Sequence, residues 1–293
     1  MLYGALEAGG TKMVCAIGDE NGHIKEIKTF PTTTPEETMP LLLGFFQQYP
    51  IEALGIGCFG PIDLDKNSPT YGYITSTPKL AWQNFDICGA FRDKLNIPIG
   101  FDTDVNGSCL GEMTYGAAKG LHSAAYITVG TGVGVGICVN GTLLHGMMHG
   151  EAGHMLVKKY SSDTFLGACP FHGDCIEGLC AGGSIEKRYG IKSYLLEETD
   201  IVWSYTGYYI AQLIVNLILT VSPQRVILGG GVMKQKQLFP IIREQVPQIL
   251  KGYVKTKELE NMNEYIVEPQ CKDQQGVLGA LLLGYEALNR MKS

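Results

Sequence analysis

Four side chains that can bind a metal ion lie in one short segment of the sequence. They are His154, Cys169, His172 and Cys175, spaced His-x14-Cys-x2-His-x2-Cys. Two histidines and two cysteines can form a closed tetrahedral zinc site. The segment that holds them is rich in glycine and proline and has little to bury, so a metal ion would give it order. The spacing predicts a structural zinc ion without an open position. The alternative is an ordinary thiol pair beside unrelated histidines.

Two glycine-rich turns could bind phosphate. The first contains Gly9, Gly10, Thr11 and Lys12, and the second contains Gly130, Thr131 and Gly132. Backbone N–H groups in such turns can approach an anion closely, because no Cβ blocks the path. The first turn adds a hydroxyl and a cation, and the second adds a hydroxyl. Either turn alone could be a tight hairpin. Their matching places in a repeated pattern favour a polyphosphate held from both sides.

Asp104 is the candidate for general-base chemistry. It lies between a predicted strand at residues 97–101 and a predicted helix at residues 105–115. Catalytic groups of α/β folds commonly lie at such strand ends. Phosphoryl transfer needs positioning, charge neutralisation and a group that accepts the hydroxyl proton. The competing interpretation is that Asp104 only caps the helix, and the residues alone leave both interpretations open.

Familiar nucleotide-binding motifs do not account for these turns. The sequence contains no G-x-x-x-x-G-K-[ST] loop. Residues 55–60 spell G-x-G-x-x-G, but Pro61 follows directly and no helix opens there. The acidic residue that a dinucleotide site places about twenty positions later is also missing. We therefore do not expect a dinucleotide-binding domain.

The elements that would position these residues alternate between strand and helix. We predict strands at residues 2–7, 13–17, 23–30, 53–58, 97–101, 123–129, 133–139, 225–228 and 264–267, and another beginning at residue 142. We predict helices at residues 35–49, 105–115, 201–221, 238–250 and 276–290. A strand, a glycine turn, a strand, an Asn-Gly hairpin and a strand occur twice, about 120 residues apart. This pattern indicates an α/β fold with an internal duplication.

Composition narrows the class of protein. The 293 residues are 45% hydrophobic and 18% charged, which is typical of a globular chain and long enough for two domains. The net charge of −6 argues against a nucleic-acid surface, which needs a basic patch. Nine cysteines and no signal peptide before the first strand favour a reducing, cytoplasmic compartment. Residues 201–221 are strongly apolar, but Gln212 and Asn216 interrupt them, so we predict a buried helix and no membrane association.

The sequence resembles the ROK sugar kinases of the actin-like ATPase superfamily. The residues that carry the signature are Val129, Gly132, Val133, Gly134, Gly136, Ile137, Gly146, Gly150, Gly153 and His154. The resemblance covers essentially the whole chain and is strongest to the bacterial fructokinase branch. It implies two duplicated actin-like ATPase domains of the ribonuclease H-like fold, hinged around a cleft. Residues 1–117 and 276–293 would form the N-terminal domain, with the last helix returning to it, and residues 118–275 the C-terminal domain with the zinc loop.

The resemblance also implies an activity and its residues. It implies an ATP-dependent hexose kinase, a fructokinase, that uses Mg²⁺ and carries a structural Zn²⁺, with Asp104 as the base. The residues implied to bind the sugar are Thr103, Asn106, Glu151, His154 and Glu177. Those implied to bind ATP are Gly9, Gly10, Thr11, Lys12, Thr131, Gly132, Gly182, Gly183, Gly230 and Gly231. One ring nitrogen of His154 would bind zinc while the other faces the sugar. The family is often dimeric, so a homodimer is expected.

Three positions depart from the usual family pattern. Glu7 begins the first loop in place of Asp, which leaves open whether this carboxylate takes part in magnesium coordination. Thr103 precedes Asp104 where Asn is common, and His172 stands near the place of a third zinc-binding cysteine. These departures match the fructokinase branch together, which motivates fructose as the substrate.

Two alternatives stay open. One is a kinase for another hexose, namely glucose, mannose, allose or an N-acetylhexosamine. The other is a non-enzymatic sugar sensor, because some ROK relatives are repressors with a DNA-binding domain ahead of the kinase fold. Met1 enters the first predicted strand directly, which leaves no room for such a domain, and the retained Asp104 favours catalysis.

Overall fold

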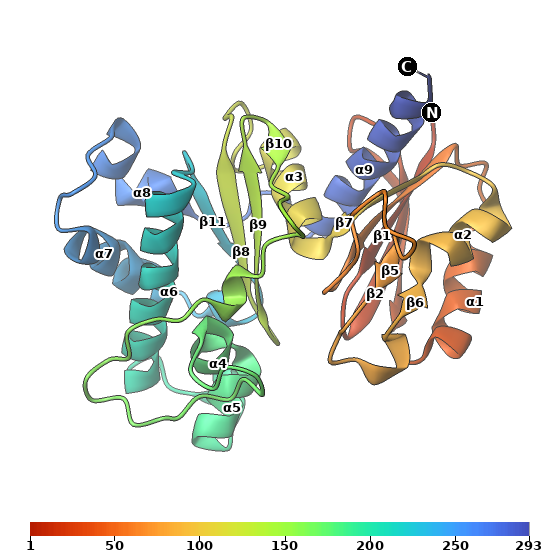
Figure 1. The fold of residues 1–293 in the computed structure, drawn as a ribbon. Helices are drawn as coiled ribbons and strands as arrows, with labels where there is room; N and C mark the ends of the chain where they lie inside the picture. The colour runs from red at the N-terminus through yellow and green to blue at the C-terminus, as the bar shows by residue number, and fades with distance from the viewer. Residues whose placement is uncertain (293) are drawn as a thin grey trace. The chain divides into compact units, whose positions relative to one another are not determined.

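A computed structural model describes residues 1–292, which form two compact units. The first unit contains residues 1–119, 143–149 and 270 onward, and the second contains residues 120–142 and 150–269. Each unit is built on a five-stranded sheet with helices packed against it (Figure 1).

The sheet of the first unit has the strand order β3-β2-β1-β4-β7. Its strands are β1 (Tyr3–Ala8), β2 (Lys12–Gly18), β3 (Ile24–Pro31), β4 (Ala53–Cys58) and β7 (Ile99–Thr103). The first three form an antiparallel meander, whereas β1, β4 and β7 run parallel to one another. β4 is buried along its whole length, as expected of a parallel strand covered on both faces. A separate two-stranded sheet pairs β5 (Tyr73–Ile74) with β6 (Phe85–Asp86).

Helices cover both faces of this sheet. Leu6 and Ala8 lie in one hydrophobic core with residues of α1 (Pro35–Phe46) and α2 (Ile87–Leu95). Tyr3 and Ala5, on the opposite face, pack with residues of α9 (Gln275–Lys292). This alternation follows from the two-residue period of a strand. A further helix of the first unit, α3 (Asp104–Tyr115), packs against α9.

Glycines allow α9 to approach its neighbours closely. A Cβ added to Gly55 of β4 would overlap the backbone of α9 at Ala280. A Cβ added to Gly279 of α9 would overlap the backbone of α3 at Gly107. Backbone-to-backbone packing of this kind needs residues without a side chain, so these glycines fix where the C-terminal helix lies.

The sheet of the second unit has the order β10-β9-β8-β11-β12. Its strands are β8 (Ala124–Val129), β9 (Val133–Val139), β10 (Thr142–Leu143), β11 (Val226–Gly229) and β12 (Ile266–Val267). β8 is antiparallel to β9 and parallel to β11, and β11 is parallel to β12. Asn140 and Gly141 link β9 to β10 with φ of 51° and 74°, the left-handed pair that an Asn-Gly hairpin turn requires. The two sheets thus share one strand order, which confirms the predicted α/β fold with an internal duplication.

The long apolar helix of the second unit is α6, and most of it is buried. The helices of this unit are α4 (Ile176–Cys180), α5 (Gly182–Tyr189), α6 (Ile201–Thr220), α7 (Leu238–Leu250) and α8 (Met262–Tyr265). By length and composition α6 could cross a membrane, but 67% of its most apolar window is buried inside the protein. Its core residues pack with those of α7 and the sheet. The prediction of a buried core helix at residues 201–221 is confirmed.

Short 3₁₀ turns complete the structure. They are η1 (Leu80–Trp82), η2 (Ala152–His154), η3 (Ser193–Leu195), η4 (Val232–Lys234) and η5 (Lys257–Glu260). η1 directly follows Lys79, and η2 ends at His154.

The prediction for one short segment was partly wrong. Of the strand expected at residues 264–267, only β12 (Ile266–Val267) forms, because residues 264 and 265 belong to α8, which the Asn261 side chain caps by accepting from the Asn263 amide. The strand expected to begin at residue 142 is β10, which begins there and ends at Leu143. The helix α2 was not predicted at all, although Asp86 caps its start by accepting from the Gly89 amide.

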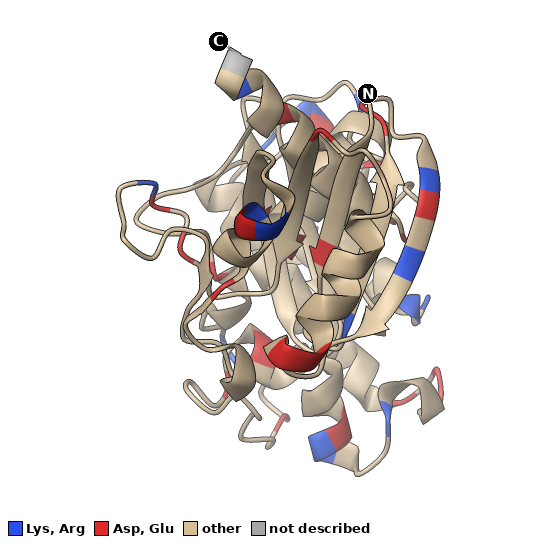
Figure 2. Ribbon diagram, turned by 90° about the vertical axis from the view of Figure 1, so that its right-hand side faces the viewer, with Lys and Arg blue, Asp and Glu red and all other residues tan. Residues whose placement is uncertain are grey.

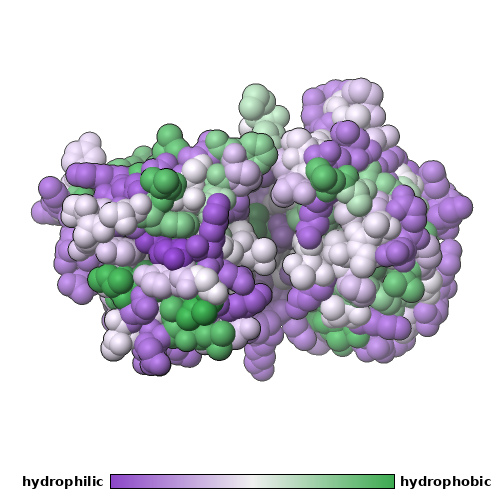
Figure 3. Space-filling model, turned by 90° about the horizontal axis from the view of Figure 1, so that it is seen from below, coloured by the Kyte–Doolittle hydropathy of each residue, from purple (hydrophilic) through white to green (hydrophobic). Residues whose placement is uncertain are grey.

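Charged residues of both signs and small hydrophobic areas are distributed through the views in Figures 2 and 3. Lys and Arg lie among Asp and Glu over the face seen in Figure 2. Hydrophobic residues form several small, separate areas among hydrophilic ones on the face seen in Figure 3. Function therefore has to be inferred from particular groups of side chains.

Candidate active site

Asp104 is the first residue of α3 and lies at the carboxyl end of β7. The N-cap of α3 is Thr103, whose hydroxyl accepts from the Asn106 amide at 3.1 Å. Capping is thus performed by the neighbouring residue, and the interpretation of Asp104 as the cap is wrong. Oδ1 of Asp104 accepts from the Val105 amide at 2.9 Å, and its second carboxylate oxygen, Oδ2, can accept a further proton or hydroxyl.

The first glycine loop leaves the same sheet edge as Asp104. Ala8 pairs with Cys58, and Cys58 pairs with Thr103, so β1, β4 and β7 end at the same level. The loop follows Ala8 and Asp104 follows Thr103. Adjacent strands are about 4.8 Å apart, which places the loop and Asp104 two strands, or roughly 10 Å, from one another within the first unit.

Burial raises the pKa values of two carboxylates at this edge. Burial raises the pKa of Asp104 to about 6. Burial raises the pKa of Glu7 to about 7, helped by the charge of Asp104 and opposed by the charge of Lys12. A carboxylate whose pKa lies near neutral pH is well matched to take up a proton during catalysis. The arrangement can therefore supply a general base at the same sheet edge as the first glycine loop.

The first loop is a tight turn whose polar side chains face solvent. The Gly9 amide donates to the Lys12 carbonyl at 3.0 Å, and a Cβ on Gly9 would lie 2.7 Å from that same oxygen. The Thr32 hydroxyl donates to the Gly9 carbonyl at 2.7 Å and ties the loop to the end of β3. Thr11 and Lys12 are exposed. The loop is fixed in shape and presents a hydroxyl and an ammonium group outward.

The second loop is assembled from three separate parts of the second unit. The Gly182 amide, at the start of α5, donates to the Gly130 carbonyl at 2.7 Å. Gly230, which follows β11 with φ of 94°, lies so close that a Cβ there would be 2.5 Å from the Val129 carbonyl oxygen. Gly231 lies beside Gly130 as well. The structure thus brings together the predicted nucleotide residues of this unit, at an uncapped helix N-terminus whose N–H groups favour anions.

Glu177 supports the second loop. Its Oε2 accepts from the Val133 amide at 3.0 Å, and a Cβ on Gly132 would lie 2.6 Å from that oxygen. The side chain is half-buried in the first turn of α4. One carboxylate oxygen of Glu177 therefore holds the loop, and its other oxygen can still accept a hydroxyl.

The four predicted metal ligands converge. The ligand atoms of His154, Cys169, His172 and Cys175 lie within 4.8 Å of one another. Nδ1 of His154 is 3.7 Å from the Cys169 sulfur and 3.6 Å from the Cys175 sulfur. In a tetrahedral zinc site with Zn–S of about 2.3 Å and Zn–N of about 2.0 Å, a sulfur and a nitrogen stand about 3.6 Å apart. The four side chains thus have the chemistry and the spacing of a closed zinc site.

His154 belongs to the turn η2, which Glu151 precedes. Glu151 is exposed, and its carbonyl accepts from the His154 amide at 2.9 Å. Because Nδ1 of His154 faces the two sulfurs, Nε2 is the nitrogen that remains for another partner. This geometry agrees with the two-sided role expected for His154.

Sequence reasoning missed a polar cluster beside Asp104. Nε2 of His145 is 2.8 Å from Oδ2 of Asp102, and the Asn106 side-chain amide donates to Oδ1 of Asp102 at 2.7 Å. Asp102 is only 3% exposed. The hydrogen bond with the Asp102 carboxylate raises the pKa of His145. A buried carboxylate needs hydrogen-bond partners. The position of Asp102 at the end of a predicted strand could therefore have indicated a partner such as a histidine.

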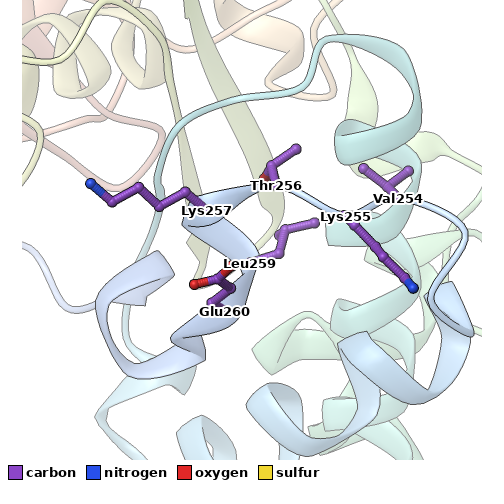
Figure 4. Close-up of a pocket in the computed structure, with 6 residues that line it drawn as sticks. All are labelled: Val254, Lys255, Thr256, Lys257, Leu259 and Glu260. Atoms are coloured by element: carbon purple, nitrogen blue, oxygen red, sulfur yellow. The ribbon is translucent and has the colours of Figure 1, made fainter.

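An open pocket lies elsewhere in the second unit. It has a volume of about 330 Å³ and is lined by Val254, Lys255, Thr256, Lys257, Leu259 and Glu260 (Figure 4). No residue predicted to act in catalysis, metal binding or nucleotide binding lines it.

Two units of one strand order, each with a glycine loop after its first strand, form a duplicated α/β fold of the actin-like ATPase type. The model of the ROK family matches residues 3–286, and the chain belongs to this family. A protein of Bacillus subtilis (strain 168) is 46% identical over 288 residues, which are 98% of this chain and 96% of the relative. A fructokinase of Pediococcus pentosaceus is 44% identical over 288 residues, which are 98% of this chain and 99% of the relative.

Solved structures agree on the fold. The ROK hexokinase from Thermus thermophilus superimposes with a TM-score of 0.81 at 24% identity, covering 99% of this chain and 100% of the other. A ROK family glucokinase from Streptomyces griseus, in complex with glucose and AMPPNP, gives a TM-score of 0.75 at 22% identity, covering 98% and 100%.

Proposed function

We propose that the protein is an ATP-dependent fructokinase. It would transfer the terminal phosphoryl group of ATP to a hydroxyl of D-fructose, which yields ADP and a fructose phosphate. The observation that carries this proposal is the 44% identity, over nearly the full length of both chains, to a fructokinase. The position of Asp104 at the same sheet edge as the first glycine loop supports the chemistry.

Asp104 would act as the base. Its carboxylate, with a pKa of about 6, is ionised at neutral pH and can accept the proton of the attacking hydroxyl. The first loop would hold the transferred phosphoryl group through its N–H groups, Thr11 and Lys12. Thr131, Gly132, Gly182 and Gly183, with Gly230 and Gly231, would hold the rest of the nucleotide.

Magnesium fits the carboxylates at this edge. Mg²⁺ prefers oxygen ligands and commonly binds one or two carboxylates together with substrate phosphates. Glu7 and Asp104 are partly buried carboxylates, and burial raises the pKa of each. The charge of Asp104 raises the pKa of Glu7 further, and a bound cation would relieve that repulsion. When bound, the ion would neutralise phosphate charge.

Zinc would serve structure and would orient one sugar contact. His154, Cys169, His172 and Cys175 would hold it with no open position, as in closed zinc sites. The metal would fix the tautomer of His154 and turn Nε2 toward the sugar.

We propose further sugar contacts at Thr103, Asn106, Glu151 and Glu177. Thr103 and Asn106 lie beside Asp104, and Glu151 and Glu177 flank the metal segment in the sequence. Thr103 and Glu177 already serve the cap and the second loop, so each would contribute a further hydrogen bond. We propose that the two units are the two ATPase-like domains, and that the enzyme is a cytoplasmic homodimer.

A coupled kinase assay across a hexose panel tests the proposal. With ATP and Mg²⁺ present, kcat/KM should be higher for D-fructose than for glucose, mannose, allose or N-acetylhexosamines. A clear preference for one of those sugars would reject fructose and keep the kinase. Sugar binding without ATP turnover would instead favour a sensor.

A further inference from the structure

A second lysine lies against the first glycine loop. If Gly10 carried a Cβ, that atom would be 3.0 Å from Cε of Lys79 and 4.0 Å from its Nζ. The Lys79 side chain thus lies along the loop backbone, with its ammonium group beside the residue at the centre of the turn. Lys79 comes from a segment almost seventy residues later in the sequence.

The segment that carries Lys79 is held in place by buried groups. Trp82 is fully buried, and its ring N–H donates to the Thr33 carbonyl at 2.8 Å. Thr77 is also buried, and its hydroxyl accepts from the Lys79 amide at 3.3 Å. Gln83 donates to the Thr77 carbonyl at 2.9 Å. These contacts fix the backbone of Lys79 on both sides.

One short stretch joins this segment to the loop. Thr33 accepts from Trp82, and the preceding residue, Thr32, donates through its hydroxyl to the Gly9 carbonyl at 2.7 Å. The loop is therefore attached to Thr32 and the Lys79 segment to the adjacent Thr33, both directly after β3. A lysine placed in this way is more constrained than one on a free surface loop.

The ammonium group of Lys79 is not paired with a carboxylate among the described residues. Within residues 1–292, no ion pair of Lys79 is formed. Lys12, at the other end of the loop, already lowers the pKa of the nearby Glu7. Lys79 is thus a cation beside a turn whose N–H groups suit an anion.

We propose that Lys79 is a second cation of the first phosphate loop and binds the terminal phosphate of ATP together with Lys12. This inference rests on the proposed kinase function. The terminal phosphate is assigned because Asp104 and the loop lie at one sheet edge of the same unit, and the transferred group has to reach the hydroxyl held by the base. An ammonium group at that point would neutralise charge on the transferred phosphate.

Nucleotide titration of the full chain tests the assignment. Lys79→Met keeps length and removes charge, and Lys79→Arg keeps charge. Calorimetry should show that Lys79→Met weakens ATP binding at least about tenfold, which corresponds to the loss of one charge-assisted contact. Its ADP affinity and its KM for sugar should stay within about twofold of the wild type, and Lys79→Arg should recover most of the loss. Lys66→Met, at an exposed lysine of the same unit, is the control and should bind both nucleotides like the wild type.

The possible results separate the two proposals. Equal weakening of ATP and ADP would reject the terminal phosphate, and unchanged ATP affinity would reject Lys79 altogether. If ATP binding falls selectively but fructose is not phosphorylated by the wild type, Lys79 is retained and the substrate is rejected. If Lys79→Met unfolds at the same temperature as the wild type, misfolding is excluded as the cause of weaker ATP binding.

Discussion

The two glycine loops occupy the same place in two sheets of the same strand order, yet their surroundings differ. The first loop carries Lys12, has Lys79 beside it and leaves the sheet edge where Asp104 lies. The second loop has a neutral hydroxyl at Thr131, rests on Glu177 and is packed against other glycine turns. A glycine turn follows the first strand of each sheet, closed by a bond from Gly9 to Lys12 in the first unit and from Gly130 to Gly132 in the second. The side chains around each turn then gave the first loop the charges that suit phosphoryl transfer, and gave the second the close backbone packing that suits nucleotide binding.

Removing the base should produce the largest effect. Asp104→Asn keeps the shape and removes the basicity, and general-base contributions are about 10²–10⁴-fold. We expect turnover to fall by that much, with ATP affinity nearly unchanged, as measured by steady-state kinetics and nucleotide titration. Thr131→Ala in the second loop is the comparison, and should affect nucleotide affinity more than turnover. If Asp104→Asn kept most of its turnover, the base would have to be another residue.

The pH profile sharpens the same prediction. Burial raises the pKa of Asp104 to about 6, and only the ionised form accepts a proton. For the wild type, kcat/KM should therefore fall as pH decreases through about 6, rather than through the ordinary range near 3.8. An acid limb that stayed flat down to pH of about 5 would contradict a role for this carboxylate.

Loss of the metal segment should have the next largest effect, confined to the second unit. Elemental analysis should find about one zinc per chain. Cys175→Ser should lose the metal and raise the KM for sugar about 10- to 100-fold, because His154 loses the partner that orients it. Cys138→Ser, a buried thiol outside the metal segment, should keep both zinc and sugar affinity. Metal-free protein with full activity would reject the zinc site.

Neutralising the first loop should have a moderate effect on ATP alone. Lys12→Ala should weaken ATP use about tenfold, the scale of one charge-assisted contact, while the sugar KM changes little. Thr131→Ala should have a smaller effect, because a neutral hydroxyl is the weaker partner of phosphate. KM values for ATP and fructose, measured for both variants, test this prediction. Equal effects at the two loops would remove the distinction between them.

The smallest effect is expected at His145, in stability. Asp102 raises the pKa of His145, so the pair is strongest when the histidine is protonated. Its contribution should be complete below the ordinary histidine pKa of 6.5 and should fade as pH rises through the higher pKa of the folded state. The urea midpoint of His145→Gln should therefore lie further below the wild type at pH of about 5.5 than at about 8.5. His122→Gln, at an exposed site, should show no such trend, and the reverse trend would contradict the pairing.

Local pattern was enough for many elements. Residues 53–58, 133–139 and 238–250 were predicted with the bounds that the structure gives them. The spacing of apolar residues and the flanking turn residues depend only on nearby positions in the sequence. These elements can therefore be predicted without knowledge of the tertiary structure. Short elements such as β12 and α4 were misjudged or missed, because two to five residues give too little period to measure.

The sequence by itself determined the two glycine turns, the spacing of the four metal ligands and the place of Asp104 at a strand end, since each depends on residues close together in the chain. Only the tertiary structure decided which distant residues meet. It brought Gly182 and Gly231 to Gly130, His145 to Asp102 and Lys79 to Gly10. It also gave the helix cap to Thr103, while Asp104 accepts from the Val105 amide through Oδ1 alone. Contacts of this kind come from the packing of strands and helices that are remote in sequence, and no local propensity encodes them.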